Sequence, residues 1–203
     1  MTGQADGEAV VRGRRLAVDV GSVRVGLAGS DPDGLIATPV DTLARDTRTA
    51  GRALPTDLAR IVDEVCERSA AVVYVGLPRH LSGDEGAAAG AARAYAVRLA
   101  QAVAPVPVRL VDERMSTVSA HQALYASGMS GRRHRTVVDQ AAAVVILQAA
   151  LDTERATGLR SGERVEVDPD VPGEREGTAG RDTTVPGDIV RAPHDRTEGR
   201  PGE

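Results

Sequence analysis

The sequence predicts a single α/β domain with a mixed five-stranded sheet flanked by helices. Short apolar runs of strand length come first, and they then alternate with longer segments of helical period. The chain contains no Phe and no Trp, so the core must be built from Val, Leu, Ile and Ala. Strands that alternate with helices imply parallel crossover connections in the second half of the sheet.

The first half of the domain is predicted to be a meander followed by a helix. Its three apolar runs are residues 14–20, 23–28 and 35–40. A helix is expected over 55–69, because apolar residues recur there at helical spacing and Pro55 is acceptable at a helix start.

The second half is predicted to alternate between strands and helices. The strands are residues 71–76 and 106–111, and the helices are 84–103, 117–127 and 136–152. The helix over 84–103 is rich in Ala, and its small side chains would let it lie close to the sheet. The complete order is therefore βββαβαβαα.

Charge and composition place the domain within residues 14–152. Residues 153–203 hold 12 acidic residues and 8 Arg, which is the whole of the net charge of −4. That segment also holds 8 Gly and 5 Pro and has little hydrophobic periodicity, so we expect a disordered acidic tail. Residues 1–13 are expected to be a disordered N-terminus.

The sequence gives no sign of a membrane or secretory protein. No apolar run reaches the roughly 18 residues of a membrane span, and the first 13 residues do not resemble a signal peptide. Cys66 is the single cysteine, so no internal disulfide can form. We expect a cytoplasmic protein with no membrane partner.

Carboxylates at the ends of buried strands are the candidates for chemistry. Asp19 lies inside an apolar strand, Asp112 and Glu113 follow another, and Asp139 begins the last predicted helix. Each has an ordinary structural alternative: a turn aspartate, an ion pair with Arg114, or a first-turn acid favoured by the helix dipole.

Three acids at one sheet edge would repel one another unless a cation neutralised them. Magnesium prefers oxygen ligands and shares its remaining coordination positions with phosphate oxygens, which a set of acids without His or Cys would permit. Such a site is suited to cleavage of phosphodiester bonds.

The residues around these acids resemble the YqgF family of pre-16S rRNA nucleases, which are also described as Holliday-junction-resolvase-like. The matching segments are 15–21 (RLAVDVG), 24–28 (RVGLA), 75–78 (VGLP), 111–117 (VDERMST) and 138–143 (VDQAAA). They occur in the family's order, and the resemblance as a whole covers about residues 14–152. The chain departs from the family pattern at 79–82 (RHLS) and at Ser116, which affects substrate contacts and leaves the acids unchanged.

The resemblance implies an RNase H-like fold and a cytoplasmic hydrolase that matures the 5′ end of pre-16S rRNA during ribosome biogenesis. It also implies cleavage that depends on Mg²⁺ or Mn²⁺, with Asp19, Glu113 and Asp139 as the catalytic and metal-binding residues. Spacing alone does not decide between Glu113 and Asp112; the family motif selects Glu113.

Five arginines are expected to contact the phosphates of the substrate. Arg132, Arg133 and Arg135 are predicted to lie in a loop directly before the helix that carries Asp139, where they could approach a bound backbone. Arg24 and Arg114 are further candidates. The alternative for the loop is a solvated basic surface.

Three other functions are compatible with parts of the sequence. Residues 19–22 resemble the first phosphate loop of actin-like ATPases and sugar kinases, but those enzymes need two such domains and the chain is too short for them. The substrate could be branched DNA, which would require a homodimer instead of a monomer. A non-catalytic module that binds nucleic acid or ribosomal particles would have no use for acids beside phosphate.

Overall fold

A computed structural model describes residues 7–49, 53–80, 82–115 and 132–167; of Met115 and of residues 132–140 it describes the backbone alone. The elements are β1 (Arg14–Val20), β2 (Arg24–Ser30), β3 (Ala37–Ala44), α1 (Thr56–Arg68), β4 (Ala70–Leu77), α2 (Ala87–Val103), β5 (Val108–Asp112), the short 3₁₀ helix η1 (Glu113–Met115), α4 (Arg132–Thr157) and β6 (Glu163–Arg164). The predicted α/β class is confirmed, and the described elements from β1 to β5, with the last helix α4 after them, occur in the predicted order. The helix predicted over 117–127 lies outside the described residues.

The strands form one mixed sheet in the order β3-β2-β1-β4-β5-β6. The first three strands are antiparallel neighbours, while β1, β4 and β5 run parallel. β6 pairs with β5 in the antiparallel sense and adds a sixth strand that the sequence did not predict. The parallel arrangement of β1, β4 and β5 results from the two connections that contain α1 and α2. The alternation of strand and helix patterns in the sequence predicted such crossovers.

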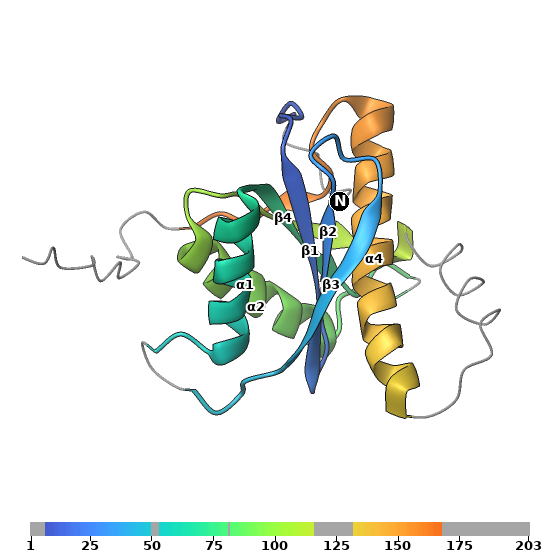
Figure 1. Ribbon diagram of the computed structural model, residues 1–203. Coiled ribbons are helices and arrows are strands. Elements are labelled where there is room, and N and C mark those ends of the chain that lie inside the picture. Colours follow the sequence, from blue (N-terminus) through green and yellow to red (C-terminus); the bar gives the residue numbers. More distant parts are fainter. Residues whose placement is uncertain (1–6, 50–52, 81, 116–131, 168–203) are drawn as a thin grey trace, which may run out of the picture. The chain divides into compact units, whose positions relative to one another are not determined.

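Helices cover both faces of the sheet, with α1 and α2 on one face and α4 on the other (Figure 1). The core on the α1 and α2 side is the larger one and contains most of the buried Val and Leu side chains. α2 contributes small buried residues to it, namely Ala89, Ala92, Ala96 and Ala100, in keeping with a helix that lies close to the sheet. The core under α4 contains Tyr74 and buried Ala, Val, Ile and Leu side chains. None of the helices in these described ranges is long and apolar enough to cross a membrane.

The structure differs from the sequence prediction at the C-terminal boundary. The last helix does not end at residue 152 but continues to Thr157, and residues 158–167 then return to the edge of the sheet. Arg109, which is fully buried, donates hydrogen bonds to the carbonyl oxygens of Ser161 (2.7 Å) and Gly162 (2.7 Å). The expectation of disorder is therefore wrong for residues 153–167, because buried charges and backbone hydrogen bonds order a polar segment that hydrophobicity alone would not.

The N-terminal boundary also differs. The expectation of a disordered segment over 1–13 is wrong for residues 7–13, because Ala9 forms an antiparallel bridge with Leu159. The Val10 amide donates to Gly158 (3.1 Å), and the Arg160 amide donates to Glu8 (2.8 Å). The two ends of the described domain therefore pair with each other. Residues 1–6 and 168–203 lie outside the described part of the chain, and for them disorder stays a prediction.

Candidate active site

Three parallel strands end together at one edge of the sheet. The register places Val18 of β1 opposite Val75 of β4, and Gly76 of β4 opposite Val111 of β5. Asp19 follows Val18 directly, and Glu113 is the first residue after β5. The acids predicted from the ends of the first and fifth strands are thus brought to the same edge, at the carboxyl ends where open α/β sheets place their sites.

The alternation of side chains along the strands decides which face the site occupies. The residues that lie two positions before the edge and pack under α4 are Ala17, Tyr74 and Val111. Because side chains alternate between the two faces of a strand, Asp19 and Gly76 share this face. The candidate site therefore lies on the side of the sheet that α4 covers.

Gly76 provides the space in which the Glu113 side chain lies. A Cβ atom at position 76 would lie 2.5 Å from Glu113 Oε1 and 2.6 Å from Ile146 Cδ1 of α4. No larger residue fits this position unless the carboxylate or the helix moves. The glycine of the VGLP segment is thus a requirement of the site, because it lets a carboxylate and a helix meet directly above the sheet.

Burial, together with the negative charges of Asp19 and Asp112, raises the pKa of Glu113 to about 7. The carboxyl group is therefore partly protonated near neutral pH in the metal-free protein. Crowded carboxylates of this kind bind a proton or a cation in order to relieve their repulsion. Hard oxygen ligands at this position are consistent with a divalent cation such as Mg²⁺ or Mn²⁺.

Asp112 has surroundings that differ from those of Glu113. Its carboxylate accepts hydrogen bonds from the Arg114 guanidinium (2.6 Å to Oδ2) and from the Arg114 amide (3.0 Å to Oδ1). Arg79 Nη1 lies 3.9 Å from Asp112 Oδ2. These bonds, with that from the Arg114 side chain foremost, lower the pKa of Asp112. The ion pair with Arg114 that the sequence left open is therefore made by Asp112, and Glu113 is the acid that shares its surroundings with Asp19.

The third predicted acid, Asp139, lies on α4, and its side chain is outside the described residues. Position 139 is seven residues before Ile146, so about two helical turns separate them and both positions occupy one side of the helix. Among the side chains that the structure describes, no group of three His, Cys, Asp or Glu residues forms a metal site. The role of Asp139 in such a site stays a prediction.

The predicted phosphate-binding arginines lie on three different elements. Arg24 begins β2, and Arg114 lies in η1 with an exposed side chain that is paired with Asp112. The sequence predicted a loop at residues 132–135. This prediction is wrong, because these residues form the first turn of α4. Arg is a good helix former and the preceding glycine is residue 131, so the helix can begin four residues earlier than the apolar pattern indicated. The side chains of Arg132, Arg133 and Arg135 are outside the described residues.

A second group of residues holds the turn that follows Asp19. Arg45 donates a hydrogen bond to the carbonyl oxygen of Gly21 (2.9 Å), stacks over the Tyr95 ring at 4.7 Å and lies 3.9 Å from Asp57. The turn is tight, because a Cβ atom on Gly21 would lie 2.8 Å from the Arg24 carbonyl oxygen. Sequence reasoning missed Arg45, since a lone arginine after an edge strand carries no recognisable signal.

Comparisons with known proteins show to which family the chain is similar. The family model described as "RuvX: Holliday junction resolvase" matches residues 13–153. A Streptomyces coelicolor protein with the name "Putative pre-16S rRNA nuclease" is 54% identical over 164 residues, which cover 81% of this chain and 95% of the relative. A Rhodococcus erythropolis protein of the same name is 53% identical over 152 residues, or 75% of this chain and 84% of the relative.

Among solved structures, Thermus thermophilus RuvC in complex with a Holliday junction substrate aligns with a TM-score of 0.46 and 15% sequence identity. The alignment covers 72% of this chain and 98% of that protein.

Proposed function

Because the chain belongs to the RuvX family, we propose that it is a metal-dependent nuclease that hydrolyses phosphodiester bonds at the 5′ end of pre-16S rRNA. The observation that carries the proposal is the meeting of Asp19 and Glu113 at the ends of parallel strands, with the pKa of Glu113 raised by burial and by its acidic neighbours. The names of the relatives supply the substrate. Such a nuclease would act in the cytoplasm on precursor ribosomal particles.

In this proposal, Asp19, Glu113 and Asp139 hold Mg²⁺ or Mn²⁺. The bound cation would neutralise the carboxylates and the negative charge that develops on the phosphodiester during hydrolysis. The protein contributes orientation: β1 fixes Asp19, and the end of β5 fixes Glu113 above Gly76. The cover provided by α4 keeps part of the site away from water, which strengthens electrostatic interactions there.

The arginines would hold the substrate backbone beside these acids. Arg24 follows the turn after Asp19, Arg114 follows Glu113, and Arg132, Arg133 and Arg135 precede Asp139 along α4. Each acid therefore has an arginine within seven residues in the chain. Contacts of this kind read phosphate and not base identity, so selectivity would come from the shape of the substrate or from a ribosomal partner.

A second candidate substrate is a four-way DNA junction, because the family description names a Holliday junction resolvase. The same acids would serve either substrate, since both contain phosphodiester bonds. A resolvase must cut two strands in register and would need to act as a homodimer. The oligomeric state during cleavage therefore separates the two candidates.

The test is to incubate the purified full chain with a pre-16S leader RNA and, separately, with a four-way DNA junction. Each reaction contains Mg²⁺, Mn²⁺ or a chelator, and an Asp19→Asn variant serves as the paired sample. We expect cleavage of the RNA with either metal, none with the chelator, and a loss of at least about 10²-fold in the variant because one ligand is lost. Cleavage by Asp19→Asn at the parent rate would contradict the assignment of the site, and cleavage of the junction alone would reverse the choice of substrate.

A further inference from the structure

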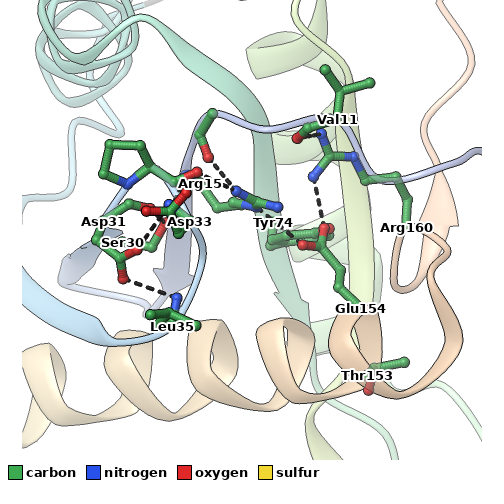
Figure 2. Close-up of polar contacts among 12 residues, drawn as sticks. Val11, Arg15, Ser30, Asp31, Asp33, Leu35, Tyr74, Thr153, Glu154 and Arg160 are labelled. Atoms are coloured by element: carbon green, nitrogen blue, oxygen red, sulfur yellow. Dashed lines mark hydrogen bonds and ion pairs between the residues drawn. The ribbon is translucent and has the colours of Figure 1, made fainter.

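A fully buried carboxylate fixes the C-terminal part of α4 to the sheet (Figure 2). Glu154 lies on α4, and its Oε2 accepts a hydrogen bond from Arg15 Nε of β1 at 3.0 Å. Its Oε1 accepts one from Arg160 Nη1 at 2.7 Å and another from the Tyr74 hydroxyl of β4. The three charged side chains are 2–3% exposed, and Tyr74 is fully buried.

The two arginines of this cluster are themselves held by backbone carbonyl groups. Arg15 Nη1 donates to the carbonyl oxygens of Gly13 and of Pro32 (3.1 Å to the latter). Arg160 Nη2 donates to the carbonyl oxygen of Val11 at 3.1 Å. The two arginines that bind the Glu154 carboxylate are therefore themselves hydrogen-bonded to the backbone. A shift of the carboxylate would require the backbone to move as well.

A buried cluster of this kind contributes little net free energy to the stability of the fold. Removing three charges from water costs several kcal/mol per ion, so apolar replacements of buried ion pairs are often as stable as the original or more stable. A buried charge cluster can instead favour one arrangement of the chain over others, because its hydrogen bonds require a particular geometry. We therefore expect Glu154 to contribute to the position of α4 on the sheet more than to the stability of the fold.

The rest of the described α4 interface is mainly apolar. Gln148 adds two hydrogen bonds at its margin: its Oε1 accepts from the Ala37 amide (3.0 Å), and its Nε2 donates to the Leu35 carbonyl oxygen (3.3 Å). The buried apolar side chains in the described part of the helix are Ala143, Ile146, Leu147, Ala150 and Leu151, and they share a core with small residues such as Ala17 and Ala28. Aliphatic side chains of similar shape tolerate a small slide of one surface over another better than hydrogen bonds do. Each residue of slippage would move the helix by about 1.5 Å along its axis.

A slide of α4 would disturb the candidate site directly. Ile146 of the helix lies against Gly76 beside the Glu113 carboxylate, eight residues before Glu154. Asp139 is on the same rigid helix, a further seven residues toward its N-terminus. A displacement of about 1 Å in a catalytic group can cost about 10²-fold in rate.

We propose that Glu154, together with Arg15, Arg160 and Tyr74, is a positioning cluster that sets the register of α4 on the sheet and so places Asp139 relative to Asp19 and Glu113. The effect on cleavage rests on the proposed function, whereas the effect on register does not. The four residues act through the helix and touch neither substrate nor metal.

The central experiment replaces the charges with apolar side chains, in the triple variant Arg15→Met, Glu154→Leu and Arg160→Met of the full chain. We expect a Tm close to or above that of the parent. We also expect kcat for the pre-16S leader to fall by about 10-fold to 10²-fold. Arg132, Arg133 and Arg135 are on the same helix, so KM is expected to rise as well, and the fall in kcat at saturating RNA is the readout for the acids.

A second readout reports the register without any catalysis. Spin labels on Cys66 of α1, which is exposed, and on an Ala156→Cys substitution at an exposed position near the end of α4 give the distribution of distances between the two helices. The parent should give one narrow distribution, and the triple variant a shifted or broader one. If the parent cleaves neither RNA nor junction, the proposed function fails, and the spin-label result still decides the positioning role.

Two further variants complete the design. Tyr74→Phe removes one hydrogen bond and leaves both ion pairs, so it should fold and show a smaller loss of kcat and a modest broadening of the distances. Arg155→Met, which removes an exposed ion pair with Asp152 on the same turn of α4, should change neither. A stable triple variant with the kcat and the distances of the parent would overturn the proposal. If the triple variant does not fold, parent values for both measurements in Tyr74→Phe would overturn it equally.

Discussion

At the level of single residues, Asp112 and Glu113 are neighbours in the chain with opposite electrostatic surroundings. Asp112 is bound by the Arg114 guanidinium, which lowers its pKa, whereas Glu113 is turned under α4, where burial raises its pKa. A strand that ends at residue 112 separates the two side chains, because successive residues of a strand face opposite sides of the sheet. Two adjacent residues thus have different roles: Asp112 forms a structural ion pair, and Glu113 is a candidate metal ligand.

The pKa of Glu113 makes a prediction about stability in the absence of metal. A folded-state pKa of about 7, against an ordinary value of 4.5, means that folding favours the protonated carboxyl. This stabilisation is present below about pH 4.5 and is lost as the pH rises through about 7. Glu113→Gln removes the effect, so in chelator the variant should gain roughly 1–3 kcal/mol over the parent between about pH 4.5 and pH 8.

Urea unfolding of both chains across this pH range measures the difference. Taking the difference between parent and variant cancels the contributions of all other titrating groups. With Mg²⁺ added at about pH 8, the parent should gain stability and the variant much less, because a ligand is missing. Parallel pH curves for the two chains in chelator would show that Glu113 is not in the surroundings described.

At the level of elements, the sequence predicted most of the strands and helices and failed where polar contacts decide. Runs of Val and Leu identified β1, β4 and β5, since a strand buried on both faces is almost continuously apolar. The same reasoning placed the acids at the strand ends. It could not find the first turn of α4, where the residues are basic, or β6, whose two residues are Glu and Arg.

The revised start of α4 leads to a prediction about substrate binding. Replacing Arg132, Arg133 and Arg135 together with Gln should weaken binding of the RNA and reduce the slope of log K against log salt. Each lost phosphate contact accounts for about 0.7 to 0.9 of that slope. Gln is also a good helix former, so the helix should persist. Binding measured by fluorescence anisotropy at several salt concentrations gives the slope.

The matched control removes three exposed arginines elsewhere, Arg12, Arg155 and Arg164, and so makes the same change in net charge. It should lower the slope much less than the first triple variant does. Equal slopes for the two triple variants would mean that only the overall charge matters and that the first turn of α4 makes no specific contact.

At the level of the whole molecule, the domain is completed by segments that composition assigned to its disordered ends. The average composition of residues 153–203 is dominated by charged residues, Gly and Pro. It therefore gives no sign of the short stretch in which Glu154, Arg160 and Val165 are buried. Composition averages cannot register a contact between residues that are far apart in the sequence, such as Arg15 and Glu154. The C-terminal boundary of the domain could therefore not be predicted from the sequence, whereas the fold class could.

Two truncations test where the domain ends. A chain that ends at residue 167 should keep the Tm and the activity of the full chain. A chain that ends at residue 157 loses Arg160 and the partners of Arg109, and so should lose about 3–5 kcal/mol of unfolding free energy or fail to accumulate as folded protein. Circular dichroism melts of both products measure this, and equal Tm values for the two would show that residues 158–167 contribute nothing.

The pairing of residues 8–10 with residues 158–160 also constrains how the protein is made. Synthesis releases the N-terminal strands first, but their last partners are almost the final residues of the domain to emerge from the ribosome. The nascent chain therefore holds β1, β2 and β3 without the helix that covers one face of them until about three quarters of the polypeptide has been translated. An apolar sheet face that stays uncovered is prone to aggregation, so we expect nascent molecules of this nuclease to depend on chaperones more than a domain of its size with local contacts would.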